Sequence, residues 1–336
     1  MASNLNKMIS RNLILCIVFT ILPSQTSAQD IDNIVSSKNI NADSYIRLYV
    51  DNDYFTGTDE QYTEGLNLEL VMPWIRKFPL SRLLVHPLFT HIRYGIGVEQ
   101  ACYTPDYLQN QSLQTYGRPF AGTLFLKTFL IATDSVKKQW FATTLSTGVI
   151  GPASQAGRIQ DNFHALIQDV QPPGWKYQIR NDAILNYQVN YEKQFLSYGN
   201  YFIADGEGMA RAGTLSDKAG VGINVMAGYF QSPFSVTGRF SSECQVYVFD
   251  NPEVDVVGYD ATLQGGLFDR SSPYTIPAAD ISRIVFINHA GLALAINHWY
   301  LAYNEYYLAP QFSTGPYHLW GGIQVALAID RKKNNT

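Results

Sequence analysis

The sequence predicts an all-β protein, a twelve-stranded antiparallel transmembrane β-barrel with a short helix in an outward loop. Short segments in which apolar and polar residues alternate recur along the chain, with turn residues between them. Charged residues make up 15% of the chain, below the roughly 25% of soluble domains, whereas Tyr (22) and Phe (18) are abundant. The chain also begins like an exported protein. These three observations favour a barrel in the outer membrane.

Residues 1–28 resemble a secretory signal peptide. Lys7 and Arg11 precede the apolar stretch 13–22, and small residues at 26–28 suit cleavage. Cleavage removes two of the 24 basic residues and none of the 28 acidic ones, so the net charge becomes −6. This balance gives no indication of nucleic-acid binding. No later run approaches the roughly 18 apolar residues of a membrane helix.

After a polar lead over residues 29–44, the barrel is expected to occupy residues 45–329, followed by a polar tail at 330–336. The predicted strands lie near 45–52, 62–71, 91–100, 122–132, 139–149, 179–195, 199–212, 217–230, 242–250, 283–294, 297–308 and 315–329. An even number of strands leaves both chain ends on one side.

Three of these segments show the alternation most clearly. The residues expected to face lipid are Tyr187, Val189, Tyr191, Val221, Ile223, Val225, Tyr317, Leu319, Ile323, Val325, Leu327 and Ile329. The residues between them are mostly polar or small, which suits a narrow barrel interior.

Connection lengths orient the predicted barrel, because periplasmic turns are short and outward loops are long. The connections after the third, fifth and ninth strands are long, so the odd-numbered strands run outward. Residues 72–90 are a long exception on the periplasmic side. Cys102, just after the third strand, and Cys244, at the start of the ninth, then lie at opposite ends. We therefore expect no Cys102–Cys244 disulfide.

The first hairpin carries an acidic tip. Asp51-Asn52-Asp53-Tyr54-Phe55 is followed by Asp59 to Gly65, and the flanking segments alternate like strands. Asp, Asn and Glu supply the hard oxygen ligands that calcium takes, although the spacing is not that of an EF-hand. The same residues suit a solvated turn, which is the favoured interpretation from these residues alone.

A short amphipathic helix is expected within residues 156–169. Ile159, Phe163, Leu166 and Ile167 recur at helical spacing, and Gln160 and His164, four residues apart, share a face. A lone histidine is more often packing or surface than catalytic. Gly117-Arg118-Pro119-Phe120-Ala121-Gly122 is either a rim turn or a place where Arg118 meets a lipid phosphate.

These motifs together resemble the lipid A 3′-O-deacylase family. The resemblance rests on the two parts of the first hairpin, on residues 117–122, on Gly148-Val149-Ile150-Gly151-Pro152 with Gln160 and His164, and on Asp260-Ala261-Thr262-Leu263-Gln264-Gly265. It implies a monomeric outer-membrane barrel that requires Ca²⁺ and hydrolyses the acyl ester at the 3′ position of lipid A in lipopolysaccharide. Where the family has an acidic residue shortly after the helix histidine, this chain has Val170, preceded by Asp169.

The resemblance also implies the site. The essential residues of the family fall on Asn52, Asp53, Thr63 and His164, with calcium near Asn52 and Asp53. The expected mechanism is that of secreted phospholipase A2, in which the histidine activates a water molecule, the metal stabilises the oxyanion, and Thr63 orients the base or the ligand shell. Gln160 and Arg118 are the candidates for contacts with the substrate.

Two other functions remain open. The first is an outer-membrane phospholipase with a serine nucleophile, for which Ser146 is a candidate without an obvious histidine partner. The second is a pore or adhesin that has lost catalysis, since polar interior residues would suit a narrow water-filled lumen.

Overall fold

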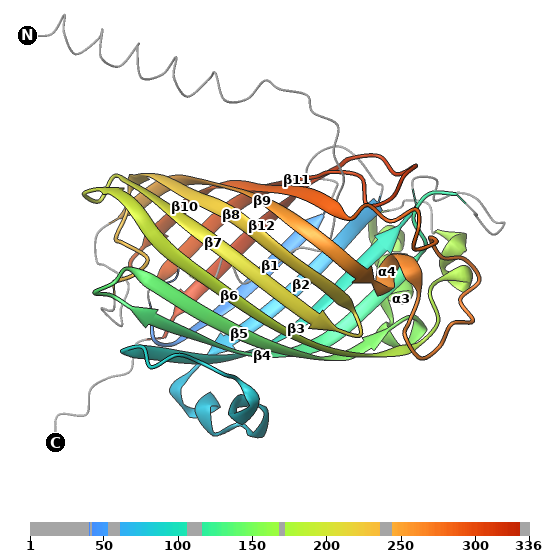
Figure 1. Cartoon of the computed structure of the whole chain (residues 1–336), viewed down its shortest axis with the longest axis horizontal. Coiled ribbons are helices and arrows are strands. Elements are labelled where there is room, and N and C mark those ends of the chain that lie inside the picture. Colours follow the sequence, from blue (N-terminus) through green and yellow to red (C-terminus); the bar gives the residue numbers. More distant parts are fainter. Residues whose placement is uncertain are drawn as a thin grey trace, which may run out of the picture.

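The structure is a computed structural model that describes residues 40, 42–52, 61–105, 116–167, 172–235 and 244–329. For residues 61–63, 163, 164, 166 and 167 only the backbone is described. In this part of the chain twelve antiparallel strands form a closed barrel, in which each strand pairs with its sequence neighbours and β1 pairs with β12 (Figure 1). None of the described helices has the length and apolar character needed to cross a membrane.

The barrel predicted from the sequence is confirmed, and most strands begin and end within a few residues of the expected positions. The strands are β1 (Tyr45–Asn52), β2 (Gln61–Val71), β3 (His91–Thr104), β4 (Ala121–Asp134), β5 (Gln139–Ile150), β6 (Asp182–Tyr198), β7 (Phe202–Gly213), β8 (Ser216–Tyr229), β9 (Gln245–Asp260), β10 (Ile284–Ile296), β11 (Trp299–Leu308) and β12 (His318–Ala328). The helices are α3 (Ala156–Ile167) and α4 (Ala261–Gln264), with 3₁₀ turns η3 (Pro73–Lys77), η4 (Pro79–Leu83), η5 (Pro152–Ser154) and η6 (Pro173–Tyr177).

Two strands are longer than predicted. β9 continues to Asp260, ten residues beyond the predicted end at 250. β3 reaches Thr104, so Cys102 lies inside this strand rather than just after it. Pairing with β8 and β4 keeps these residues in the sheet.

The alternation of side chains divides each strand between an inner and an outer face, as predicted. In β12 His318, Gln324 and Ala326 are buried, whereas Leu319 and Ile323 are exposed on the outer wall. The strands β6 and β8 alternate in the same way. The exposed apolar residues on the outer face suit lipid.

Ion pairs fill the interior near the first four strands. The Arg47 guanidinium lies 2.6 Å from the Glu69 carboxylate, and Lys127 Nζ lies 3.1 Å from Glu69 and 2.7 Å from Glu99. Buried charges are tolerated only when they are paired in this way. The network therefore links β1, β2, β3 and β4 across the inside of the barrel.

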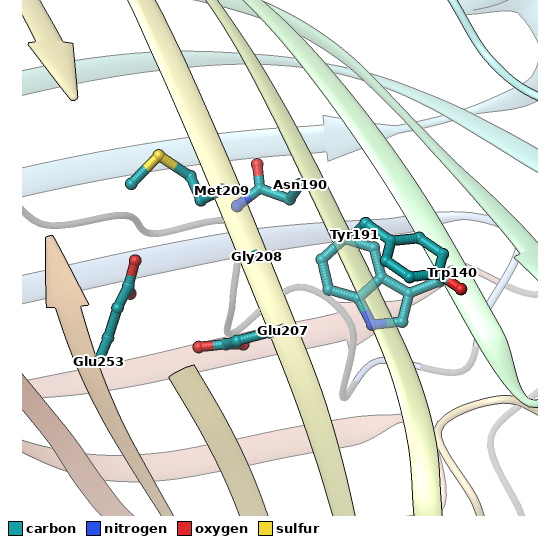
Figure 2. A pocket seen from close by; sticks show the side chains of 7 residues that line it. All are labelled: Trp140, Asn190, Tyr191, Glu207, Gly208, Met209 and Glu253. Carbon is teal, nitrogen blue, oxygen red and sulfur yellow. The ribbon is translucent and has the colours of Figure 1, made fainter. Parts of the chain in front are cut away.

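Side chains also fill the middle of the barrel near β5 to β9. A cavity there has a volume of about 10 Å³, the size of one water molecule (Figure 2). Its lining is Trp140, Asn190, Tyr191, Glu207, Gly208, Met209 and Glu253. Trp140 Nε1 donates to Glu192 at 2.9 Å, and Asn251 Nδ2 donates to Glu207 at 2.5 Å. These buried and hydrogen-bonded side chains occupy this part of the interior.

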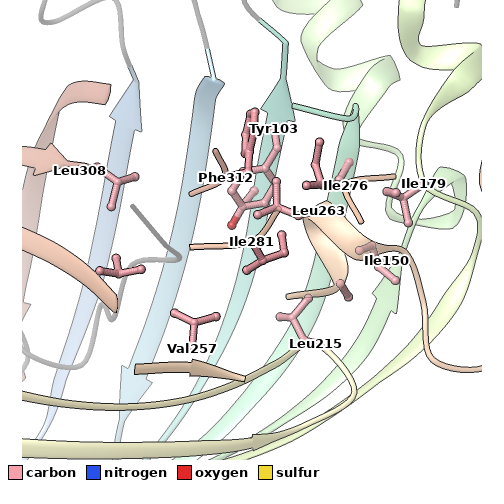
Figure 3. Packing of buried hydrophobic residues seen from close by; sticks show 14 of the residues in the cluster. Tyr103, Ile150, Ile179, Leu215, Val257, Leu263, Ile276, Ile281, Leu308 and Phe312 are labelled. Carbon is pink, nitrogen blue, oxygen red and sulfur yellow. The ribbon is translucent and has the colours of Figure 1, made fainter. Parts of the chain in front are cut away.

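An apolar cluster fills the mouth of the barrel at the rim that carries α3 and α4 (Figure 3). Tyr103 from the wall meets Leu263, Ile276, Ile281 and Phe312 from the connections that follow β9 and β11. A β-bridge joins Ile281 to Phe312, and the Ile276 amide donates to the Leu263 carbonyl at 2.8 Å. These two connections fold inward and pack over the barrel core.

The two rims differ in the length of their connections. One rim holds the segments 105–120, 151–181 and 261–283 together with the short turn 214–215, and the other holds the short turns 135–138, 199–201 and 297–298. The exceptions on the second rim are 72–90, as predicted, and 230–244, for which the predicted strand bounds had left residues 231–241. The first rim is therefore outward and the second periplasmic. Cys102 and Cys244 are both free, which confirms the expectation that no disulfide joins them.

Candidate active site

Four residues near the outward ends of β1 to β4 form one row across the sheet. Cα pairing joins Asn52 to Glu64, Glu64 to Cys102, and Cys102 to Gly122. Tyr49, three residues before Asn52, and Tyr103, next to Cys102, belong to the cluster that fills the barrel mouth. Because successive side chains alternate between faces, the row lies on the outer face of the wall.

The helix α3 packs against the outside of the wall at the end of this row. Gln100 Nε2 donates to the Ser154 carbonyl at 2.9 Å, and Cys102 Sγ lies 3.9 Å from the Ala156 carbonyl. A Cβ on Gly122 would lie 2.3 Å from the Cβ of Ala156, so only glycine permits this approach. The helix therefore begins directly over β3 and β4.

A glycine turn directs the chain from β5 toward α3. Gly151 has a φ of 97°, a left-handed conformation that favours glycine. A Cβ at this position would also lie 2.7 Å from the Arg180 carbonyl carbon, so both the backbone and the space require glycine. The Gly148–Pro152 motif thus has a structural reason.

The face of α3 toward the wall is small and polar. Ala156, Gly157 and Gln160 are buried, whereas Ile159 is 39% exposed. Trp175 Nε1 donates to Gln160 Oε1 at 2.6 Å, and the Trp175 ring packs on Phe120 at 5.2 Å between centroids. The predicted helix is confirmed, and Ile159 points away from the protein, as suits a helix beside lipid. Gln160 is held by the protein, and its contact with substrate stays a prediction.

The remaining predicted catalytic residues are placed only in part. His164 lies in α3, one turn after Gln160, but its side chain is outside the described residues. Thr63 lies in β2 where the pairing with β3 shifts register between Tyr62 and Glu64, a β-bulge of the kind often found beside active sites. Asp53 also falls outside the described residues. The structure therefore brings Asn52, Thr63 and His164 to one rim through their backbones.

Arg118 lies on the other side of the wall, in the barrel mouth. It is 2% exposed, its guanidinium carbon is 4.2 Å from the Tyr103 ring centroid, and its Nη2 donates to Thr262 Oγ1 at 2.6 Å. Nη1 donates to Gln311 Oε1. Arg118 thus connects the loops that follow β3, β9 and β11. A contact with a substrate phosphate stays a prediction.

The Asp260–Gly265 motif belongs to the same connection. Asp260 caps α4 by accepting from the Thr262 amide at 2.8 Å and from its hydroxyl at 2.6 Å, and Gln311 Nε2 donates to Asp260 at 3.3 Å. The sequence did not identify Thr262 or Gln311 as partners of Arg118, because only the fold brings these distant positions together.

Asn52 and Glu64 fit a hard cation by their chemistry. They are half-buried partners in the register and carry amide and carboxylate oxygens, the ligand types that Ca²⁺ prefers. Glu64 was part of the predicted acidic tip but not of the predicted ligands; strand alternation was the signal that could have selected it. Among the described residues no group of three or more His, Cys, Asp or Glu is placed to hold a metal. The predicted ligand Asp53 is not among these residues.

Comparison with known proteins adds independent information. The model of a family described as "Outer membrane protein LpxR" matches residues 13–329. No curated protein matches the chain. Among solved structures, LpxR from Salmonella typhimurium is similar over 85% of this chain and 100% of that chain, with a TM-score of 0.70 and 18% identity. The beta domain of the Bordetella autotransporter BrkA covers 85% and 98%, with a TM-score of 0.46 and 8% identity.

Proposed function

The chain belongs to the LpxR family of outer membrane proteins, and from this membership we propose that it is a lipid A deacylase that hydrolyses the 3′-O-linked acyl ester. The observation that carries the proposal is the position of α3. This helix, which bears His164, packs on the outer face of the wall beside the row that begins at Asn52. A site on that face is open to a substrate that stays in the membrane.

The location of the row suits an amphiphilic substrate. Asn52 and Glu64 lie near the outward ends of their strands, and the exposed residues below them on the outer face of β1 and β2 include Leu48, Leu66 and Leu68. Acyl chains can therefore remain beside the apolar wall while the ester reaches the polar residues at the rim. Hydrolysis of a lipid ester needs this separation, because the attacking water comes from the polar side.

His164 is the proposed general base. Neutral imidazole accepts a proton from water while the water oxygen attacks the carbonyl carbon of the ester. The ester C–O bond then breaks, the proton passes to the departing sugar oxygen, and the acyl group leaves as a carboxylic acid. Thr63, at the β-bulge of β2, orients the base or the ligands around it. No serine nucleophile is required.

Asn52, Asp53 and Glu64 are the proposed holders of Ca²⁺. Their oxygens are of the hard type that this ion takes. When bound, Ca²⁺ supplies positive charge where the ester carbonyl oxygen becomes negative. Asn52 and Glu64 lie on adjacent, hydrogen-bonded strands, so the sheet holds their backbones at a constant separation.

The two other functions considered from the sequence have less support. Ser146 lies in β5 opposite Lys127 and Asn186 in the register, whose side chains are buried in the barrel interior, whereas α3 packs on the outer face. The buried ion pairs inside the barrel and the apolar cluster in the mouth disfavour an open lumen. An adhesin role has no particular observation in its favour.

Mass spectrometry of lipid A tests the proposal. Cells that express the chain should produce lipid A lacking the 3′-linked acyl group, and cells that express His164→Gln should not. Release of fatty acid from glycerophospholipid instead would support the serine-dependent alternative. Unchanged lipid A from a correctly inserted wild-type barrel would contradict the proposed reaction.

A further inference from the structure

The long periplasmic connection does not hang free but lies against the outside of the barrel. We call residues 72–90 the collar; it contains η3 and η4 and appears in Figure 1 as the blue-green turns outside the wall. The Met72 amide donates to the Tyr94 carbonyl at 3.2 Å. The Tyr187 hydroxyl donates to the Leu83 carbonyl at 3.1 Å and accepts from the Val85 amide at 2.9 Å.

Apolar packing holds the collar on the outer faces of β3 to β6. Leu84 is 5% exposed and packs with Leu130, Ala132 and Leu145, and residues around this cluster include Leu80, Phe89, Ile92, Tyr94 and Tyr187. Thr143 Oγ1 donates to the Val85 carbonyl at 3.0 Å. The collar therefore covers part of the wall that lipid would otherwise contact, at the periplasmic end of these strands.

The exposed residues of the collar combine large apolar side chains with positive charge. Trp74 is 48% exposed, Leu83 and Val85 are each 58% exposed, and Leu88 is 99% exposed. Arg76, Lys77 and Arg82 are exposed as well, and the collar contains no Asp or Glu. The chain as a whole has a formal charge of −4, so this concentration of positive charge is local.

A hollow of about 330 Å³ lies between the collar and the rim. Its lining is Asp43, Pro73, Arg76, His86, His91, Ile92, Arg93 and Tyr94. Asp43 is 2.8 Å from His91 Nε2, and Arg93 donates to the Ile40 and Ala42 carbonyls. Arg76 takes part in none of the ion pairs between described residues, so it is the lining cation left to meet an anion.

We propose that the collar binds anionic glycerophospholipids of the periplasmic leaflet. Arg76 receives a lipid phosphate at the hollow, Lys77 and Arg82 pair with neighbouring headgroups, and Trp74 and Leu88 enter the boundary between headgroups and acyl chains. Aromatic residues favour this boundary, and basic side chains are attracted to anionic lipid surfaces. The proposal depends on the orientation of the barrel and not on the hydrolase assignment.

Lipid retention provides the first test. Wild-type barrel and the variants Arg76→Gln/Arg82→Gln and Lys137→Gln/Lys138→Gln are inserted into nanodiscs of phosphatidylcholine and phosphatidylglycerol, extracted, and examined by native mass spectrometry. The control removes the same charge from the turn after β4 at the same rim. We expect the collar variant to retain at least fivefold less phosphatidylglycerol, because each basic residue contributes about fivefold. The control should match wild type.

Several outcomes would overturn the proposal. If the collar variant retains as much phosphatidylglycerol as wild type, the proposed headgroup contacts do not exist. If both variants lose phosphatidylglycerol equally, the effect is one of general charge and not of the collar. If inorganic phosphate displaces the retained lipid and the barrel retains both lipids equally, the hollow binds anions in general and the lipid proposal is wrong. Activity in detergent should be unchanged in both variants, so this test is independent of the proposed catalysis.

Trp74 provides the second test. In nanodiscs containing lipids with brominated acyl chains, the fluorescence component lost in Trp74→Phe should be quenched by bromine and protected from aqueous iodide. The Trp74 signal is the wild-type fluorescence minus that of Trp74→Phe. Trp175→Phe, a change in the outward loop, is the control for this subtraction. If iodide quenches Trp74 and bromine does not, the collar faces the periplasm or a protein there, and the lipid proposal is wrong.

Discussion

Gly122 of β4 lies directly beneath Ala156 of α3, and the helix reaches the wall only because this position carries no side chain. A Cβ on Gly122 would also come within 2.5 Å of Ser154 Oγ, so an added methyl group would push against both the helix and the turn before it. The close approach of Gly122 to Ala156 and Ser154 therefore determines the position of α3 relative to the row of residues at the rim.

Gly122→Ala should lower deacylation by about 100-fold, because displacement of a catalytic group by an ångström has an effect of that order. The barrel should still form, since the substitution is on the outer face. Release of the acyl group and heat-modified gel mobility measure the two properties. Gly206→Ala is the matched control, because its nearest contact would be an ordinary 3.8 Å from Phe195. Equal activity in both variants would separate the position of α3 from catalysis.

His164→Gln should lower ester hydrolysis by at least 100-fold, the usual contribution of a general base, while the barrel folds normally. The measurement is release of the acyl group from lipid A by purified protein in detergent. His86→Gln, an exposed histidine at the opposite rim, is the control and should keep full activity. Full activity of His164→Gln would contradict the mechanism.

Removal of calcium with a chelator should abolish activity, and Ca²⁺ should restore it at lower concentration than Mg²⁺, which demands stricter octahedral geometry. Glu64→Gln and Asp53→Ala should raise the Ca²⁺ concentration needed for half-maximal activity. Titration of activity against free Ca²⁺ measures both effects. Glu305→Gln, an exposed residue on β11, is the control for loss of a carboxylate. Unchanged calcium dependence in both site variants would remove Asp53 and Glu64 from the ligand set.

Arg118→Gln should loosen the loops over the barrel mouth. The buried guanidinium donates to Thr262 and Gln311, and hydrogen bonds to charged groups contribute about 1.5–3 kcal/mol each. We expect faster proteolysis within residues 261–283 and lower stability to urea. Arg270→Gln, an exposed change in the same loop, should alter neither. If the loops stay protected and only the KM for phosphorylated lipid A rises, Arg118 meets the substrate phosphate instead.

Asp43 gives a pH-dependent prediction. The hydrogen bond from His91 lowers the pKa of Asp43 from its usual value of 3.8, aided by the charges of His91 and Arg93 and opposed by partial burial. A carboxyl group with a lowered pKa stabilises the folded state above its unfolded pKa, and this contribution is lost as the pH falls through the folded pKa.

Wild type should therefore be more stable than Asp43→Asn at pH 7, and the difference should vanish as the pH falls below about 4. The stability difference is measured from the midpoints of urea unfolding in detergent, with unfolding detected by gel mobility. His91→Gln removes the other half of the pair and should show the same pH dependence. A stability difference that does not change with pH would show that the pair makes no titrating contribution.

The strands could be predicted because the pattern that defines them is local. Alternation places His318 and Gln324 inside and Leu319 outside without knowledge of their neighbours, and the structure confirms this arrangement. Connection lengths likewise predicted the rims. The catalytic residues came from resemblance to a family, and the structure places α3, Thr63 and Asn52 at the expected rim while the His164 and Asp53 side chains stay predictions.

What could not be predicted depends on contacts between distant positions. Arg118 finds Thr262 and Gln311 only after the barrel has closed, and no local pattern joins them. The collar looked like an unusually long periplasmic connection, because its partner Tyr187 lies on another strand. The helix α3 turns its small face to the wall because Gly122 leaves space there. Ile159, on the opposite face of the helix, is exposed on the side expected to meet lipid.

The collar and α3 occupy the same side of the barrel, at opposite ends of β3. Tyr94 packs with the collar and Gln100 holds the turn before α3, so only Ile96 and Val98 present bare wall between them. Six residues of strand span about 20 Å, and the tilt shortens this further, against a usual apolar band of about 25 Å. The uncovered wall beside β3 is therefore shorter than the usual apolar band, and a lipid there lies between the collar and α3 rather than along an uninterrupted strand face.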